Sequence, residues 1–206
     1  MLLRRAGDAL QRHIILVLVV MFCAGVAATL WHLARLSSQL VESAALQGSA
    51  LQAESLEELR TLYTSEVVER LRGHGVTVTH DYAAHPGAIP LPATFSLELA
   101  RRIGANGSGM HVRLYSDYPF PWRLDGGARD AFEQDALRNL RERPDRPFFR
   151  FEEFAGGLAL RYARADRMRA GCVSCHNSHA QSPKTDWKVG DVRGVLEIIR
   201  PLDQIV

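Results

Sequence analysis

One uncharged apolar run near the N-terminus constrains the fold of this chain more than any other feature. Between Ile14 and Ala34 the sequence contains no Asp, Glu, Lys or Arg. A helix that crosses the hydrocarbon core of a bilayer needs about 20 apolar residues, whereas the apolar part of a secretory signal spans about 7–15. The run therefore predicts a transmembrane anchor over residues 14–34, with the membrane lipid bilayer as a partner. A cleaved signal sequence and a buried helix of a soluble protein are the alternatives.

The charges on either side of this run indicate its orientation. Arg4, Arg5 and Arg12 precede the run, whereas Arg35 alone follows it before the first acidic residue, Glu42. Basic residues are enriched on the cytoplasmic side of membrane spans. We therefore expect residues 1–13 in the cytoplasm and everything after about residue 36 outside it.

The segment after the span, residues 36–72, is predicted to form one long helix. It contains no proline and a single glycine, Gly48, and its apolar residues recur mostly three or four positions apart. The helical pattern ends near Gly73 and Gly75. Such a helix is either a stalk or a signalling element that transmits movement to the membrane. A homodimer through the long helix is a further expectation.

Residues 73–206 are predicted to form a small α+β domain. Thr94 is the expected N-cap of a helix that stops at Gly104, and a second helix is expected before Pro144. Strand patterns without a βαβ rhythm predict an antiparallel sheet of about five strands with flanking helices, which is compatible with a PAS-like fold. The expected strands are residues 76–80, 110–115, 149–154, 158–165 and 192–200.

Charge and motif content exclude several classes of function. The 206 residues carry 25 basic and 23 acidic side chains, so the net charge of +2 gives no sign of a nucleic-acid partner. Paired catalytic carboxylates, a Ser-His-Asp order and phosphate-binding glycine loops do not stand out. We therefore expect no nucleic-acid partner and no enzymatic activity.

The residues with distinctive chemistry form the string CVSCH at 172–176. C-x-x-C-H is the attachment pattern of c-type haem, in which two thiols add to the haem vinyl groups and the adjacent imidazole binds iron. It predicts one covalent haem c, with thioethers at Cys172 and Cys175 and with His176 as the proximal iron ligand. Haem attachment takes place outside the cytoplasmic membrane, which agrees with the expected orientation. The alternatives are a C-x-x-C redox pair, a zinc site completed by His179, and a structural disulfide.

Three segments carry a family resemblance: CVSCHNSHAQSPKTDWKVGDVRGVLEI from Cys172, AIPLPATF at 88–95 and RLYSDYPFP at 113–121. They resemble the periplasmic, c-type-haem-binding PAS-like sensor domains often found ahead of bacterial histidine kinases and nucleotide cyclases. The resemblance covers about residues 36–200. It implies a periplasmic sensor of redox state or of a diatomic gas. Together with the span predicted from the apolar run, this gives the expectation of a single-pass protein of the bacterial inner membrane with its C-terminal domain in the periplasm. It also implies a signalling or redox partner protein and a haem edge packed near Lys184, Trp187, Lys188 and Asp191.

The sixth iron ligand separates the functions open to such a protein. A strong second ligand favours electron transfer or redox sensing, and an open position favours gas binding. His85 is the predicted distal ligand, because its proline-rich loop would hold a ligand at little entropic cost. Other candidates are His80, His111, Met110, Met168 and Tyr63, and the candidates for contacts with haem propionates are Arg161, Arg164, Arg167 and Arg169.

Three functional hypotheses follow from these residues. The first is a membrane-anchored haem c sensor whose iron chemistry alters the sheet and the long helix. The second is a monohaem electron-transfer cytochrome c. The third is a zinc or thiol module without haem.

Overall fold

The computed structural model describes residues 2–202, with the backbone alone for residues 2–12, 107 and 108. The chain divides into two compact units, Met1–Ala44 and Ala45–Val206. Of the predicted cytoplasmic segment 1–13, Met1 and the side chains of residues 2–12 lie outside the described part, as do residues 203–206 of the predicted outer domain. The orientation of the span therefore rests on the sequence.

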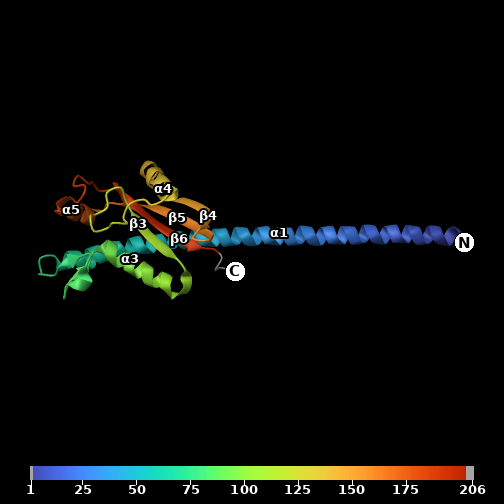
Figure 1. The fold of residues 1–206 in the computed structure, drawn as a ribbon, viewed down its shortest axis with the longest axis horizontal. Helices are drawn as coiled ribbons and strands as arrows, with labels where there is room; N and C mark the ends of the chain where they lie inside the picture. Colours follow the sequence, from blue (N-terminus) through green and yellow to red (C-terminus); the bar gives the residue numbers. More distant parts are fainter. Residues whose placement is uncertain (1, 203–206) are drawn as a thin grey trace. The chain divides into compact units, whose positions relative to one another are not determined.

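The N-terminal unit is the first part of helix α1, Leu2–Leu62 (Figure 1). The large apolar side chains between Ile14 and Leu33 are exposed, and Phe22 is 72% accessible. No residue in the most apolar 18-residue window of this helix is buried. The predicted long apolar N-terminal helix is thus present, and its length and exposure are compatible with a single-pass membrane anchor.

A four-stranded antiparallel sheet forms the centre of the C-terminal unit, in the order β3-β6-β5-β4. Its strands are β3, His111–Tyr115; β4, Phe148–Phe154; β5, Gly157–Arg167; and β6, Val192–Pro201. β4 and β5 form the predicted hairpin, whose turn contains Ala155 (φ 54°) and Gly156 (φ 89°) in left-handed conformations. The prediction of an α+β fold with an antiparallel sheet is confirmed.

The sheet has four strands rather than the predicted number of about five. The segment 76–80 contains only the short strand β1, Val78–Thr79, which pairs in parallel with β2, Ile89–Pro90, in a separate two-stranded sheet. Pro90 and Pro92 have no amide hydrogen to donate, so this pair cannot extend into a longer ladder. The proline-rich loop therefore keeps β1 out of the main sheet.

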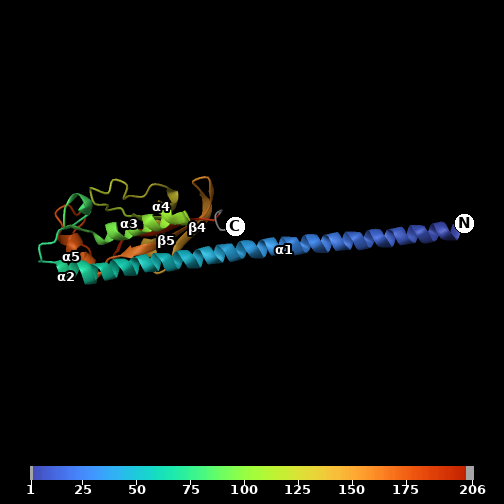
Figure 2. The ribbon, with the colours of Figure 1, turned by 90° about the horizontal axis from the view of Figure 1, so that it is seen from below.

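One face of the sheet is covered by the later part of α1 and by α3, Pro92–Ile103 (Figure 2). Small residues recur at every fourth position of α1, and Ala45, Ser49 and Ala53 are all buried. Their size lets the helix backbone approach the strands closely. Short segments continue or link these helices: η1, a π-helical turn at Tyr63–Val68; α2, Glu69–Leu71; and η2, Tyr82–Ala84.

Helix α3 begins three residues earlier than the sequence predicted, with Leu91 and not Thr94 at the N-cap. It starts at Pro92 without a side-chain cap, so Thr94 lies within its first turn and not at the N-cap. Proline suits the first helical position, because its fixed φ matches the helix and its missing donor would be unpaired there. The chain also stays helical beyond Gly104, through the π-helical turn η3 (Gly104–Ser108), and leaves it at Gly109, where φ is 57°.

The opposite face of the sheet packs against α4, Ala131–Glu142, so α3 and α4 lie on different sides of the strands (Figure 1). Asp130 caps α4, because its carboxylate accepts a hydrogen bond from the Glu133 amide at 2.9 Å. The apolar side of the helix then packs on Tyr115, Ala163 and Val195 through four residues, Phe132, Ala136, Leu137 and Leu140.

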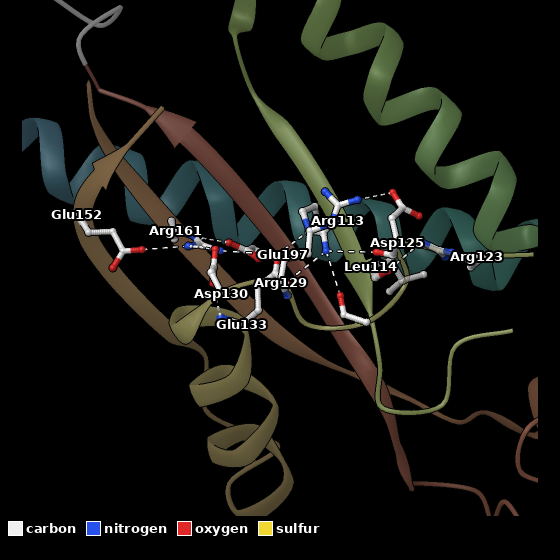
Figure 3. A network of polar contacts seen from close by, with 11 residues as sticks. Arg113, Leu114, Arg123, Asp125, Arg129, Asp130, Glu133, Glu152, Arg161 and Glu197 are labelled. Atoms are coloured by element: carbon white, nitrogen blue, oxygen red, sulfur yellow. Dashed lines mark hydrogen bonds and ion pairs between the residues drawn. The ribbon is translucent and has the colours of Figure 1, made fainter. Parts of the chain in front are cut away.

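A buried ionic network lies between the sheet and α4 (Figure 3). Arg161, which is 2% exposed, donates from Nε to Glu197 at 2.7 Å and from Nη1 to Asp130 at 2.8 Å and Glu152 at 3.1 Å. Among the described residues, Oε2 of the fully buried Glu197 has no hydrogen-bond partner. Burial, together with the nearby Glu133 and Asp130 carboxylates, raises the pKa of Glu197 to about 7. The network thus contains a carboxyl group that holds a proton near neutral pH.

This network predicts that stability falls as the pH rises from about 4.5 to about 7. In that window folded Glu197 keeps a proton that an ordinary glutamate in the unfolded chain has lost. The free energy of unfolding should decrease by up to about 1.4 kcal/mol per pH unit. Glu197→Gln, which resembles the protonated carboxyl, should remove this slope in denaturant unfolding measured across the window.

The matched control for this prediction is Glu153→Gln, because Glu153 is an exposed glutamate on β4. Its variant should keep the slope of the unmodified chain. An unchanged slope in the Glu197→Gln protein would contradict the assignment of the proton to Glu197.

Candidate functional site

The C-x-x-C-H motif lies on a helix that was not predicted from the sequence. Helix α5, Ala170–Ser178, follows β5 and contains Cys172, Cys175 and His176. Residues three and four positions apart lie on one face of a helix, so the two sulfurs and the imidazole share a face. Both cysteines are free thiols, with Cys172 partly exposed and Cys175 exposed, so the structure contains no 172–175 disulfide.

Two contacts position α5 in the C-terminal unit. The Asn177 side chain donates to the Trp187 carbonyl at 2.9 Å, and its oxygen accepts from the Trp187 amide at 2.9 Å. Near the N-terminus of the helix, a Cβ at Gly171 would lie 3.2 Å from Cγ2 of Thr64. The small residue therefore lets α5 lie close to the π-helical turn η1.

Aromatic rings and imidazoles gather beside the motif. The rings of Phe120 and Trp122 stack with centroids 4.4 Å apart, and His80 stacks on Trp122 at 4.6 Å. The His176 centroid lies 5.2 Å from Phe120, and the His179 centroid lies 5.3 Å from Phe120 and 5.4 Å from Trp122. We call these five residues the aromatic cluster. Within the cluster, the stacked rings of Phe120 and Trp122 place apolar surface next to His176, the candidate iron ligand.

The electrostatic environment keeps the His176 ring neutral. Burial, and secondarily the Arg193 guanidinium, lowers the pKa of His176 to about 4. Arg193 Nε lies 3.4 Å from Nδ1 of this ring. A neutral imidazole has a free lone pair, which is the form that binds a metal.

The cysteine environment does not match that of an activated redox pair. Cys175 is exposed as a residue, but neighbouring atoms displace part of the water around its sulfur, and this partial desolvation raises the pKa of the thiol. Redox-active C-x-x-C pairs depend on a thiolate stabilised by a lowered pKa. The site therefore gives no support to the redox alternative.

A zinc site is likewise not preformed. Among the side chains that the structure describes, no group of three or more His, Cys, Asp or Glu residues is arranged to hold a metal ion. His179, the fourth ligand of that alternative, accepts a hydrogen bond from the Gln181 amide at 3.1 Å and packs in the aromatic cluster. The donor set fits haem c better, because that cofactor needs two thiols, one imidazole and an apolar surface.

The predicted distal ligand, His85, is exposed and its Nε2 lies 2.9 Å from Oδ2 of Asp81. Met110 and Met168 are buried in the domain core, at 3% and 2% exposure. The Tyr63 hydroxyl donates to the Pro90 carbonyl at 3.0 Å. Of the residues considered for the sixth position, the structure brings His80 into the aromatic cluster. The sixth ligand stays a prediction.

The arginines considered for the propionates fall into two groups. Arg161 belongs to the buried network under α4. The second group lines a cavity of about 500 Å³ that reaches Ala170 at the start of α5; it consists of Arg164, Arg167 and Arg169. The cavity is therefore next to the motif, and two of its arginines contact carboxylates: Arg164 contacts Glu57 at 3.7 Å, and Arg167 contacts Asp145 at 2.6 Å.

Four residues of the site were given no role from the sequence: Phe120, Trp122, Arg193 and Asn177. Phe120 and Trp122 come from a proline-rich loop after β3, where an unusual density of aromatic residues was the available signal. Arg193 and Asn177 reach the site through contacts across the fold, and no local pattern marks them.

Comparison with known proteins gives one match. A family model described as Tll0287-like, Tll0287, matches residues 37–201. Comparisons with curated proteins and with solved structures give no match. The family is cytochrome-related, which agrees with the type of motif on α5. Because the match spans most of the chain, including the whole sheet and α5, this protein belongs to the Tll0287-like family.

Proposed function

We propose that this protein is a membrane-anchored haem c protein. Cys172 and Cys175 would hold one haem through thioethers, and His176 would be the proximal iron ligand. The observation that carries the proposal is the placement of two free thiols and a neutral imidazole on one helix face beside the aromatic cluster. When bound, the haem would supply a redox-active iron that can take a further ligand.

The residues around the motif have separate roles in this proposal. The clamp between Asn177 and Trp187 holds the orientation of α5. Phe120 and Trp122 shield the imidazole side of the helix from water. His176 stays unprotonated at neutral pH, so no proton must leave before it binds iron. The proposed role is non-enzymatic.

We propose sensing of redox state or of a diatomic gas as the function of this centre. The support is the close approach of α5 to the end of the long helix, where Gly171 faces Thr64. That part of the helix is the π-helical turn η1, and such turns are frequent at functional sites. A shift of α5 would displace this turn through the contact at Gly171. A partner protein or a second copy of the chain would respond to the changed position of the helix.

A monohaem electron-transfer cytochrome is the second candidate. Cys175 is exposed, which favours it because a thioether edge at the surface gives short paths to a redox partner. A carrier would show six-coordinate iron spectra, no reaction with CO or NO, and rapid electron exchange with a donor.

Hydrogen exchange distinguishes the two functions. For a sensor, reduction of the iron or addition of CO or NO should change the exchange rates of amides in residues 60–71, because this segment contacts α5. The amides in the last turn of helix α4, residues 138–142, serve as the internal reference and should not change. Equal exchange in all states, with fast electron transfer, would contradict sensing and favour the carrier.

We further propose that residues 14–34 anchor the protein in the bacterial inner membrane, with the C-terminal domain in the periplasm. The full chain should stay in the membrane pellet after alkaline carbonate extraction. The double substitution Val20→Arg and Ala24→Arg should release it, because each charge at a span centre costs about 2.5–3.5 kcal/mol. Leu40→Arg, outside the predicted span, is the control and should stay in the pellet. Release of the unmodified chain by carbonate would contradict the anchor.

Covalent haem is tested by a pyridine haemochrome spectrum of the full chain made in a host with haem c attachment machinery. We expect one haem per chain. Cys172→Ala or Cys175→Ala should leave at most one thioether and shift the spectrum, and His176→Ala should alter the iron spectrum. Cys23→Ala, which removes the thiol in the predicted span, is the control and should match the unmodified chain. A colourless protein would contradict the haem proposal and favour a zinc or thiol module.

A further inference from the structure

Arg193 is a half-buried cation without a carboxylate partner among the side chains that the structure describes. It lies near the start of β6, where its Nε is 3.4 Å from Nδ1 of His176 and its Nη1 contacts the Ser116 hydroxyl. The polar partners of its guanidinium among the described side chains are this imidazole and this hydroxyl, and neither is a carboxylate. The Asp166 carboxylate is close enough to interact electrostatically with Arg193, but it forms its ion pair with Arg60, at 2.7 Å. The positive charge of Arg193 is therefore uncompensated.

Aromatic rings flank this guanidinium. Its Cζ lies 5.5 Å from the centroid of Trp187 and 5.9 Å from that of Phe120. Trp187 is 5% exposed. Rings of this kind keep water away, so the field of the charge is screened less than at the surface. A guanidinium stays protonated in proteins, so the charge is permanent.

In the contact with Arg193 the His176 ring accepts a hydrogen bond, whereas the second ring nitrogen of a metal-binding histidine commonly donates one. A histidine that binds a metal commonly donates its second ring N–H to a carboxylate or carbonyl, which makes the ligand more basic. Here the guanidinium lies against Nδ1 as a donor, so Nε2 is the nitrogen available to a metal. A cation at Nδ1 withdraws electron density from the ring, and a carboxylate there would do the opposite.

We propose that Arg193 is a positioning residue that orients the His176 ring and raises the reduction potential of the haem centre. This inference rests on the proposed function, because it requires iron bound at His176. One-electron reduction lowers the positive charge of the iron by one unit. An uncompensated cation beside the ligand therefore destabilises the oxidised centre more than the reduced one and favours reduction.

The test is a mediated redox titration of the full-length holoprotein in detergent, followed by its absorption spectrum. Arg193→Gln keeps hydrogen-bonding ability and removes the charge. At a fixed applied potential near the midpoint, its ratio of reduced to oxidised haem should fall about tenfold, because one close charge is lost. This corresponds to about 59 mV for a one-electron couple. Arg193→Lys keeps the charge and should retain most of the original ratio.

Two further variants complete the test. Arg193→Met keeps the apolar stem against Phe120 and Trp187 and should reproduce the fall, which covers the case in which the glutamine variant does not fold. Arg138→Gln removes an exposed arginine on α4, paired there with Asp135, and should leave the ratio unchanged.

The outcomes separate this inference from the proposed function. Unmodified protein without covalent haem would overturn the proposed function itself. Covalent haem with an unchanged potential in the glutamine and methionine variants would overturn the role of Arg193 alone. An equal fall in the lysine variant would also overturn it, because the effect would then come from shape and not from charge.

Discussion

The candidate site depends on the pairing of β5 with β6. These strands are neighbours in the sheet, and the chain between them, residues 168–191, contains the whole motif helix. The base of this connection is closed by backbone hydrogen bonds from Met168 to Asp191 and from Gly190 to Met168, both at 2.8 Å. Any change that separates the two strands would therefore displace α5 as a unit.

The antiparallel sheet also explains why distant segments meet at the motif. β3 ends at Tyr115, β5 ends at Arg167 and β6 begins at Val192, and all three points lie at one end of the sheet. The loop after β3 contributes the aromatic rings, the start of β6 contributes Arg193, and the end of β5 leads into α5. In our proposal the iron centre lies at this end, next to the last turns of the long helix. A change in the redox state or the ligand of the iron would therefore act directly on this part of the helix.

The sequence predicted the features that leave a local pattern. The uncharged run at 14–34, the β4-β5 hairpin with its glycine turn, and the C-x-x-C-H spacing can each be recognised from adjacent residues. Helix α5 was missed because the side chains on its face are thiols and an imidazole, which give no apolar period. The stack of His80 on Trp122 and the approach of Arg193 to His176 depend on strand order and loop paths, so only the folded chain reveals them.

The most direct measurement of the central claim is mass spectrometry of the peptide that contains residues 170–184, taken from the full chain made with haem c attachment machinery. Our account predicts that this peptide carries one haem with no free thiol at Cys172 or Cys175. A peptide with both thiols free and alkylatable would contradict it.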